Sequence, residues 1–253
     1  GKGFQFGVNI TDFAGMKTNR RHFLKTAAAG IGYPTIIPGS ALGLDGTTSP
    51  SERISMVFIG LGNRWIGVMA AFLIHSDVQG VAVCDVHDHH YRERAWGEGR
   101  PLGAKPGKQV GDEKYGNTDC AIYSDYRQLF ERQDLDAVMI ATPDHWHGII
   151  TLAAIESGLD VYCEKPVTHK FAEGQAIYRA VAEKGTVFQV GSQQRSETVF
   201  RQAVELIRNG HVGKLSRVEV GLPAGYSAHQ GSTEVEEIPE GLDYNAWCGP
   251  SPV

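Results

Sequence analysis

A short apolar segment that runs directly into a glycine-rich turn is the most constraining feature of this chain. Residues 54–59 read ISMVFI, and Gly60 and Gly62 follow them before a stretch, 64–74, with helical spacing of apolar residues. A buried strand, a glycine turn and a helix in this order are typical of a dinucleotide-binding fold. Gly60 permits the tight turn, Gly62 lets the backbone approach a pyrophosphate, and the helix beginning near Asn63 offers free N–H groups.

Three further residues modify this turn. Arg64 could add positive charge beside a pyrophosphate. Trp65 occupies the third position of the fingerprint, where Gly or Ala usually allows the helix to pack closely on the strand. We expect the indole to push the helix outward or to shift the register so that Gly67 is used instead. A glycine turn alone is weak evidence, so the rest of the chain has to support it.

Strand-like and helix-like segments alternate from residue 53 onward. This alternation predicts an α/β fold, a Rossmann-like doubly wound parallel sheet followed by the beginning of a second α/β domain. Strands are expected at 54–59, 78–84, 137–141, 160–163, 187–190 and 215–222, and the last of them is expected to have one solvent-exposed face. Helices are expected at 64–74, 90–96, 126–132, 147–157, 171–184 and 198–209, with a long loop after 96 and Gly210 ending the last helix.

The predicted domains follow from this pattern. Residues 1–52 form a leader and linker, 53–195 an NAD-binding Rossmann domain, and 196–253 the start of a C-terminal domain for the substrate and for oligomerisation. A net charge of −5 and the lack of a basic stripe beyond residue 53 argue against nucleic-acid binding. The four cysteines have no metal-type spacing, and Cys84 and Cys163 are expected to be small buried hydrophobes.

The N-terminal part has the pattern of a twin-arginine export signal over about 16–43. Arg20 and Arg21 are followed by a weakly apolar stretch rich in Ala and Gly, and Pro34 and Pro38 would break a folded helix there. We therefore expect export to the periplasm, with no membrane anchor after the signal is removed.

Asp85 ends the second strand, where an acid that binds ribose is expected. Its carboxylate can accept both ribose hydroxyls and would repel a 2′-phosphate, which favours NAD over NADP. An aspartate that caps the next helix is the alternative. His87, His89 and His90 do not share one helix face, so no metal site is predicted.

The motif ATPDHWHG lies at the carboxyl end of the strand predicted at 137–141. Open α/β sheets bind ligands at this edge, so Thr142 and Pro143 are expected to line the nicotinamide side. Asp144 could simply begin the next helix. His147 could contact substrate or pack in the core.

CEKP ends the next strand and places a lysine at the same edge. The ammonium of Lys165 can hydrogen-bond a substrate hydroxyl and favour the alkoxide. Glu164 could orient Lys165 or bind ribose. Gln193, with Gln194 and Arg195, could donate to a polyhydroxy ligand or belong to a solvated loop.

At these motifs the chain resembles the Gfo/Idh/MocA oxidoreductase family. The likeness rests on the glycine turn, on ATPDHWH and above all on CEKP, and it extends over about 53–253, including the phrase GLDYNAWCGP. It implies a Rossmann domain, a C-terminal α/β domain with an open, mostly antiparallel sheet, and homo-oligomers formed through that sheet. It also implies hydride transfer between NAD(P) and a sugar, inositol or related polyol, with Lys165 as the catalytic or substrate-orienting group.

The sequence departs from the family pattern at two places. Trp65 replaces the third glycine, and the acid/base Asp and His of the family's second domain would lie beyond Val253, so the chain resembles a truncated member or a fragment. Two other functions stay open. One is an NAD-dependent glycosidase that acts by transient oxidation and elimination. The other is a non-catalytic sugar-binding or scaffold protein.

Overall fold

The computed structural model describes residues 39–44, 46, 48–92, 98–222 and 234–251. The chain divides into two compact units, Gly1–Ser49 and Pro50–Val253. The described part of the first unit contains a 3-10 helix, η1 (Gly39–Leu42). The expected export signal, including its two arginines, lies outside the described residues except for its last positions, 39–43.

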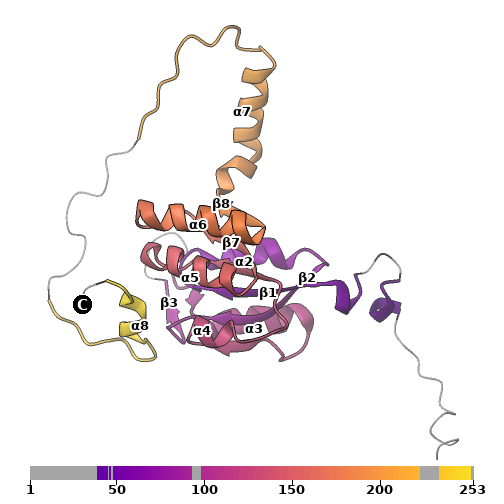
Figure 1. Cartoon of the computed structure of the whole chain (residues 1–253), viewed down its shortest axis with the longest axis vertical. Helices are drawn as coiled ribbons and strands as arrows, with labels where there is room; N and C mark the ends of the chain where they lie inside the picture. Colours follow the sequence, from indigo (N-terminus) through magenta and orange to yellow (C-terminus); the bar gives the residue numbers. More distant parts are fainter. Residues whose placement is uncertain (1–38, 45, 47, 93–97, 223–233, 252–253) are drawn as a thin grey trace, which may run out of the picture. The chain divides into compact units, whose positions relative to one another are not determined.

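The second unit begins with η2 (Pro50–Glu52) and is built on a parallel sheet of six strands in the order β5-β2-β1-β6-β7-β8 (Figure 1). Every neighbouring pair in this sheet is parallel. The strands are β1 (Ile54–Ile59), β2 (Val78–Cys84), β5 (Ala121–Tyr123), β6 (Ala137–Ile140), β7 (Asp160–Glu164) and β8 (Phe188–Gly191). The predicted doubly wound parallel sheet is confirmed.

The register aligns the carboxyl ends of the central strands. Ile59 at the end of β1 lies opposite Cys84 on one side and Ile140 on the other, and Ile140 in turn lies opposite Cys163. The strand order reverses between β1 and β6, which is the point where open sheets of this kind form a ligand crevice.

Helices cover both faces of the sheet because successive strand residues point to opposite sides. Met56 and Phe58 of β1 pack on the side of α2 (Trp65–Leu73), whereas Val57 and Ile59 belong to the core on the other side. That second core is completed by α4 (Tyr126–Leu129), α5 (Asp144–Glu156) and α6 (Phe171–Lys184). The predicted strands at 54–59 and 78–84 and the helix at 171–184 match the structure residue for residue.

The helix expected at 90–96 is wrong at its beginning, and the long loop expected after it is wrong. His90–Tyr91 forms a short strand, β3, paired antiparallel with β4 (Pro101–Leu102), and residues 93–97 lie outside the described part. The expected loop contains α3 (Ala104–Tyr115) instead.

Packing explains why α3 forms despite a proline and two glycines. A Cβ at Gly107 would lie 2.5 Å from Leu61 Cδ1, and one at Gly111 would lie 3.1 Å from Cys120 Sγ. These small residues, four apart on one helix face, let α3 approach the sheet, and that tertiary contact outweighs their low helix propensity.

The strand expected at 215–222 is also wrong. These residues are extended without strand pairing, and all side chains from 193 to 222 are exposed, including α7 (Thr198–Arg208). A strand forms only against a partner, and the described residues provide none here. Gly210 follows α7 with a φ of +78°, as predicted. The domain boundary at 196 stays a prediction.

All four cysteines are free and buried. Burial raises the pKa of the Cys120 and Cys163 thiols to about 11. The burial of Cys84 and Cys163 confirms the prediction that they behave as small buried hydrophobes. Among the described residues, no helix is both long and apolar enough to cross a bilayer.

Candidate functional site

A pocket of about 710 Å³ opens at the shared carboxyl edge of β1, β2 and β6. Seven of the residues predicted to bind a cofactor line it: Gly60, Gly62, Asn63, Arg64, Asp85, Thr142 and Pro143. The other four predicted site residues, His147, Glu164, Lys165 and Gln193, are not among its lining residues. The structure therefore gathers seven of the nine residues expected to bind the cofactor in one pocket, whereas Glu164 and Gln193, also expected to bind it, lie outside its wall together with His147 and Lys165.

Gly60 makes the turn at the end of β1 possible. Its φ is +83°, and a Cβ at this position would lie only 2.5 Å from the backbone nitrogen of Thr142. Any other residue would collide with the end of β6 and adopt a strained conformation. Gly60 therefore allows two strand ends to meet below the pocket.

Gly62 has a different environment, and it decides whether the pocket fits a dinucleotide. A Cβ at Gly62 would meet no atom within 4 Å, so its backbone borders open space. Helix α2 begins beyond it with no side-chain cap, which leaves first-turn N–H groups for an anion. The hydroxyl oxygen of Thr142, at the pocket edge, is buried and has no partner within the described part of the chain. These features fit a pyrophosphate at the turn.

Trp65 fills the core and leaves the turn in place. Its side chain is 2% exposed and packs with Leu61 and Met69 between α2 and the sheet. A Cβ at Gly67 would meet nothing within 4 Å, and Gly67 does not line the pocket. The expected shift of register to Gly67 is therefore wrong.

Asp85 lies directly after β2, and its side chain connects the end of β2 to the turn after β1. Its carboxylate oxygens accept hydrogen bonds from the backbone N–H groups of Leu61, at 2.5 Å, and His87, at 2.8 Å. Burial raises the pKa of the Asp85 carboxyl above its ordinary value, and the backbone hydrogen bonds from Leu61 and His87 oppose this shift. The carboxylate thus faces the pocket from a fixed position, where a ribose hydroxyl can donate to it.

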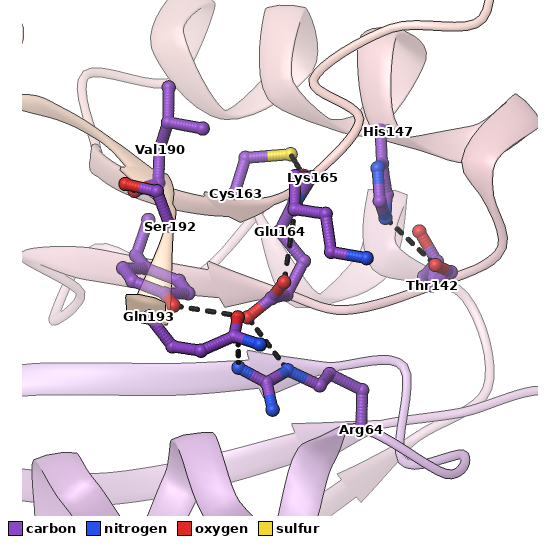
Figure 2. Close-up of polar contacts among 10 residues, drawn as sticks. Arg64, Thr142, His147, Cys163, Glu164, Lys165, Val190, Ser192 and Gln193 are labelled. Atoms are coloured by element: carbon purple, nitrogen blue, oxygen red, sulfur yellow. Dashed lines mark hydrogen bonds and ion pairs between the residues drawn. The ribbon is translucent and has the colours of Figure 1, made fainter. Parts of the chain in front are cut away.

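A polar network joins the glycine turn to the two strand ends beyond β6 (Figure 2). The guanidinium of Arg64 donates to Glu164 at 3.0 Å and to the side-chain oxygen of Gln193 at 2.9 Å. Glu164 is 3% exposed and also accepts from the Tyr162 hydroxyl at 3.1 Å. Burial and the nearby Glu164 charge raise the pKa of Tyr162 to about 12. Arg64 therefore neutralises a buried carboxylate. A phosphate at the turn would have to share the positive charge of Arg64 with Glu164.

Lys165 follows Glu164 at the same edge. Its backbone N–H donates to the second carboxylate oxygen of Glu164 at 3.3 Å. Figure 2 shows its side chain extending from the end of β7 toward Thr142. Within the described residues, its ammonium pairs with no carboxylate, so it is available to a ligand at the edge of the pocket.

His147 is buried, with 1% of its surface exposed. Its two ring nitrogens lie 2.5 Å from the carbonyl oxygen of Pro166 and 2.8 Å from that of Thr142. The ring thus links the turn after β6 to the turn after β7. A catalytic contact of His147 with substrate would require one of these hydrogen bonds to break.

Sequence reasoning missed the part of the pocket wall that comes from the tail. Helix α8 (Tyr244–Cys248), in a stretch expected to be a loop, brings Ala246 and Trp247 to the lining, and Trp146 of α5 lies beside them. The phrase GLDYNAWCGP was a signal of similarity, but no local pattern indicates that it returns to the first strands.

A parallel sheet with a glycine turn after its first strand and a carboxylate after its second defines a dinucleotide-binding Rossmann protein. The Gfo/Idh/MocA family, described as an oxidoreductase family with an NAD-binding Rossmann fold, matches residues 54–192, which is more than half of the chain. The protein belongs to this family of NAD(P)-dependent oxidoreductases, and NAD is the cofactor of the family fold.

Individual relatives include dehydrogenases and a glycosidase-type protein. The scyllo-inositol 2-dehydrogenase (NAD(+)) of Bacillus subtilis (strain 168) is 29% identical over 135 residues, which are 51% of this chain and 37% of that protein. A glycosyl hydrolase family 109 protein of Shewanella pealeana is 31% identical over 169 residues, which are 60% of this chain and 34% of that protein.

A solved structure supports the fold. Scyllo-inositol dehydrogenase from Lactobacillus casei, with bound NAD(H) and scyllo-inositol, matches with a TM-score of 0.50 and 20% identity over 64% of this chain and 42% of its own. The chain therefore spans less than half the length of these relatives.

Proposed function

We propose that the protein is an NAD-dependent oxidoreductase that transfers a hydride between nicotinamide and a sugar, inositol or related polyol. One observation carries this proposal: the Arg64–Glu164 ion pair, at 3.0 Å, joins the glycine turn to the EKP turn. A dinucleotide whose pyrophosphate lies at Gly62 would therefore extend along the strand edge toward Lys165. NAD, when bound, supplies the hydride acceptor or donor.

The residues of the chain have separate roles in this proposal. Asp85 accepts the ribose hydroxyls and disfavours a 2′-phosphate, so that NAD binds better than NADP. Lys165 donates a hydrogen bond to the reacting hydroxyl and stabilises the alkoxide that develops. Glu164 holds the backbone of Lys165 in place. His147 links the turn after β6, at Thr142, to the turn after β7, at Pro166.

The substrate class is supported by the similarity to proteins named scyllo-inositol 2-dehydrogenase and levoglucosan dehydrogenase. The Asp and His that complete the family's acid/base set belong to its second domain, so turnover is proposed for the protein together with that domain. Homo-oligomers are likewise proposed for the protein together with that domain.

Binding and turnover test the proposal separately. NADH titrated into the purified chain should bind, as followed by its fluorescence, and mass spectrometry should detect NAD(H) that co-purifies. In protein that includes the second domain, Lys165→Ala should lower kcat about 10²–10⁴-fold with little change in NADH affinity, and Lys165→Arg should retain part of the rate. Absence of NADH binding, or full activity of Lys165→Ala, would overturn it.

A second candidate, an NAD-dependent glycosidase that oxidises its substrate transiently, is favoured by the similarity to a glycosyl hydrolase family 109 protein. An aryl glycoside separates the two. Release of the aryl alcohol without net formation of NADH supports the glycosidase, whereas NADH accumulation with a free polyol supports the dehydrogenase.

Export through the twin-arginine route is part of the same proposal. The support is the pair Arg20 and Arg21 before an Ala- and Gly-rich stretch. A reporter fused to residues 16–43 should be exported, and Arg20→Lys with Arg21→Lys should retain it in the cytoplasm. Unchanged export of the double variant would contradict this part.

A further inference from the structure

The segment before α8 is anchored directly beside Asp85. The backbone N–H of Asp88 donates to the carbonyl of Gly241 at 3.0 Å, and that of Asp243 donates to Val86 at 2.9 Å. Between these bonds, Leu242 forms an antiparallel bridge with His87. Three consecutive residues of the tail therefore pair with the loop that follows β2.

The other end of the segment is anchored on α5. His145 Nε2 lies 2.9 Å from the carbonyl oxygen of Trp247, and the indole N–H of Trp146 donates to the carbonyl of Ala246 at 3.0 Å. A Cβ at Gly249 would lie 2.2 Å from the ring of Trp146, and the φ of Gly249 is +53°. Only glycine permits this approach of the tail backbone to the indole.

These anchors leave the side chain of Trp247 at the pocket. Its carbonyl is bonded to α5, while Trp247 lines the pocket and is 43% exposed. Tyr244 stacks with it at a centroid distance of 6.3 Å and an interplanar angle of 8°, and the ring of His145 meets it edge-on at 5.9 Å. The indole is thus held by aromatic neighbours with part of its surface open.

The position of Asp85 indicates which half of the cofactor this wall meets. An acid at the end of β2 binds the adenosine ribose, and the nicotinamide half extends to the other side of the pyrophosphate. The tail is hydrogen-bonded to Val86, the residue after Asp85, whereas Lys165 belongs to the β7 end. An indole in the same pocket as a ribose site offers a flat apolar surface for an adenine ring.

We propose that Trp247, held by the tail segment outside the family match, forms the wall that stacks on the adenosine half of NAD. This inference rests on the proposed NAD binding and adds a cofactor-binding residue to it. The ligand recognised at Trp247 is an adenine nucleotide. Trp247 lies far along the sequence from the glycine turn that is proposed to hold the pyrophosphate.

Calorimetric titration with two half-cofactors tests the assignment. AMP carries the adenosine half of NAD, and nicotinamide mononucleotide carries the other. Trp247→Ala should weaken NADH and AMP about tenfold, as expected for the loss of one stacked base, and leave nicotinamide mononucleotide unchanged. Trp247→Phe should restore most of the AMP affinity. Tyr178→Ala removes an aromatic side chain, 77% exposed on α6 and outside this pocket, and should change nothing.

Gly249→Ala provides a second route that leaves the Trp247 side chain intact. The added Cβ collides with Trp146, so the tail should detach and AMP should again bind about tenfold more weakly. Circular dichroism should show that the sheet is retained in both variants. Unchanged AMP binding in Trp247→Ala, or a loss confined to nicotinamide mononucleotide, would overturn the inference while NADH binding by the wild type keeps the proposed function. Failure of the wild type to bind NADH or AMP would overturn both.

Discussion

The guanidinium of Arg64 lies 3.0 Å from the carboxylate of Glu164, one hundred residues later in the chain. This pair spans the strand-order reversal and fastens the glycine turn to the EKP turn. Glu164 is almost completely buried, whereas the Arg64 side chain is 40% exposed. The arginine therefore stabilises a carboxylate that would be costly to bury alone.

Arg64→Ala should reduce the free energy of unfolding by about 1–3 kcal/mol, because the buried carboxyl group of Glu164 loses its cationic hydrogen-bond donor. Chemical denaturation measures the loss. Arg201→Ala, which breaks the exposed Arg201–Glu205 pair, is the matched control and should cost less than about 0.5 kcal/mol. Equal losses in the two variants would show that the Arg64–Glu164 pair is only a surface contact.

His147→Ala should cost about 2–4 kcal/mol in unfolding free energy, because it leaves a cavity and removes the ring that lies between the carbonyl groups of Thr142 and Pro166. His145→Ala, two residues earlier in the same helix and with a single hydrogen bond to the tail, should cost less than about 1 kcal/mol. Thermal unfolding of the two variants compares them. A smaller loss for His147 than for His145 would contradict the bridging role of the buried ring.

Gly60→Ala and Gly62→Ala should separate folding from binding. Gly60→Ala should destabilise the fold by about 2–4 kcal/mol, since its Cβ meets the Thr142 backbone and its φ is positive. Gly62→Ala should change stability by less than about 0.5 kcal/mol and weaken NADH about tenfold, because its Cβ enters the space that a pyrophosphate needs. Unfolding curves and NADH titration measure both. Full NADH affinity in Gly62→Ala would place the pyrophosphate elsewhere.

The preference for NADH over NADPH should weaken as the pH falls. Burial raises the pKa of Asp85, so the carboxyl becomes neutral at a higher pH than an ordinary aspartate and then no longer repels a 2′-phosphate. The dissociation constant of NADPH divided by that of NADH, measured across pH, should fall toward one once the Asp85 carboxyl is protonated. Asp85→Asn controls for titration of the phosphate itself and should lower the ratio about tenfold at neutral pH. A wild-type ratio that follows the variant at every pH would exclude Asp85 as the selective group.

Trp65→Gly should destabilise the protein by about 3–5 kcal/mol, because a side chain that is 2% exposed leaves a cavity between α2 and the sheet. Phe171→Gly removes an aromatic side chain that is 83% exposed and should cost about 1 kcal/mol, mainly through helix propensity. Denaturant unfolding compares the two. A Trp65→Gly variant that gains stability would revive the expectation that the indole pushes the helix outward.

The central strands and α6 could be predicted from the sequence because their signals are local. Five apolar residues among the six before Gly60 are enough to specify β1, and the helical spacing in α6 needs no partner. α3 could not be predicted, since Gly107 and Gly111 lower helix propensity and only contact with Leu61 and Cys120 explains them.

The residues of the candidate site could be predicted more readily than their partners. Gly62, Asp85 and Thr142 follow strands and reach one pocket, because parallel strands share their carboxyl edge. The Arg64–Glu164 pair and the Trp247 wall depend on contacts between segments about a hundred residues apart or more, and no spacing rule specifies those.

Burial of all four thiols makes the covalent structure of this protein independent of the redox conditions around it. A thiol must be exposed and deprotonated to attack a disulfide or an oxidant. Burial raises the pKa of the thiols of Cys84, Cys120 and Cys163, and Cys248, the last residue of α8, is buried as well. A chain folded in a reducing compartment would therefore keep the same bonds in an oxidising one.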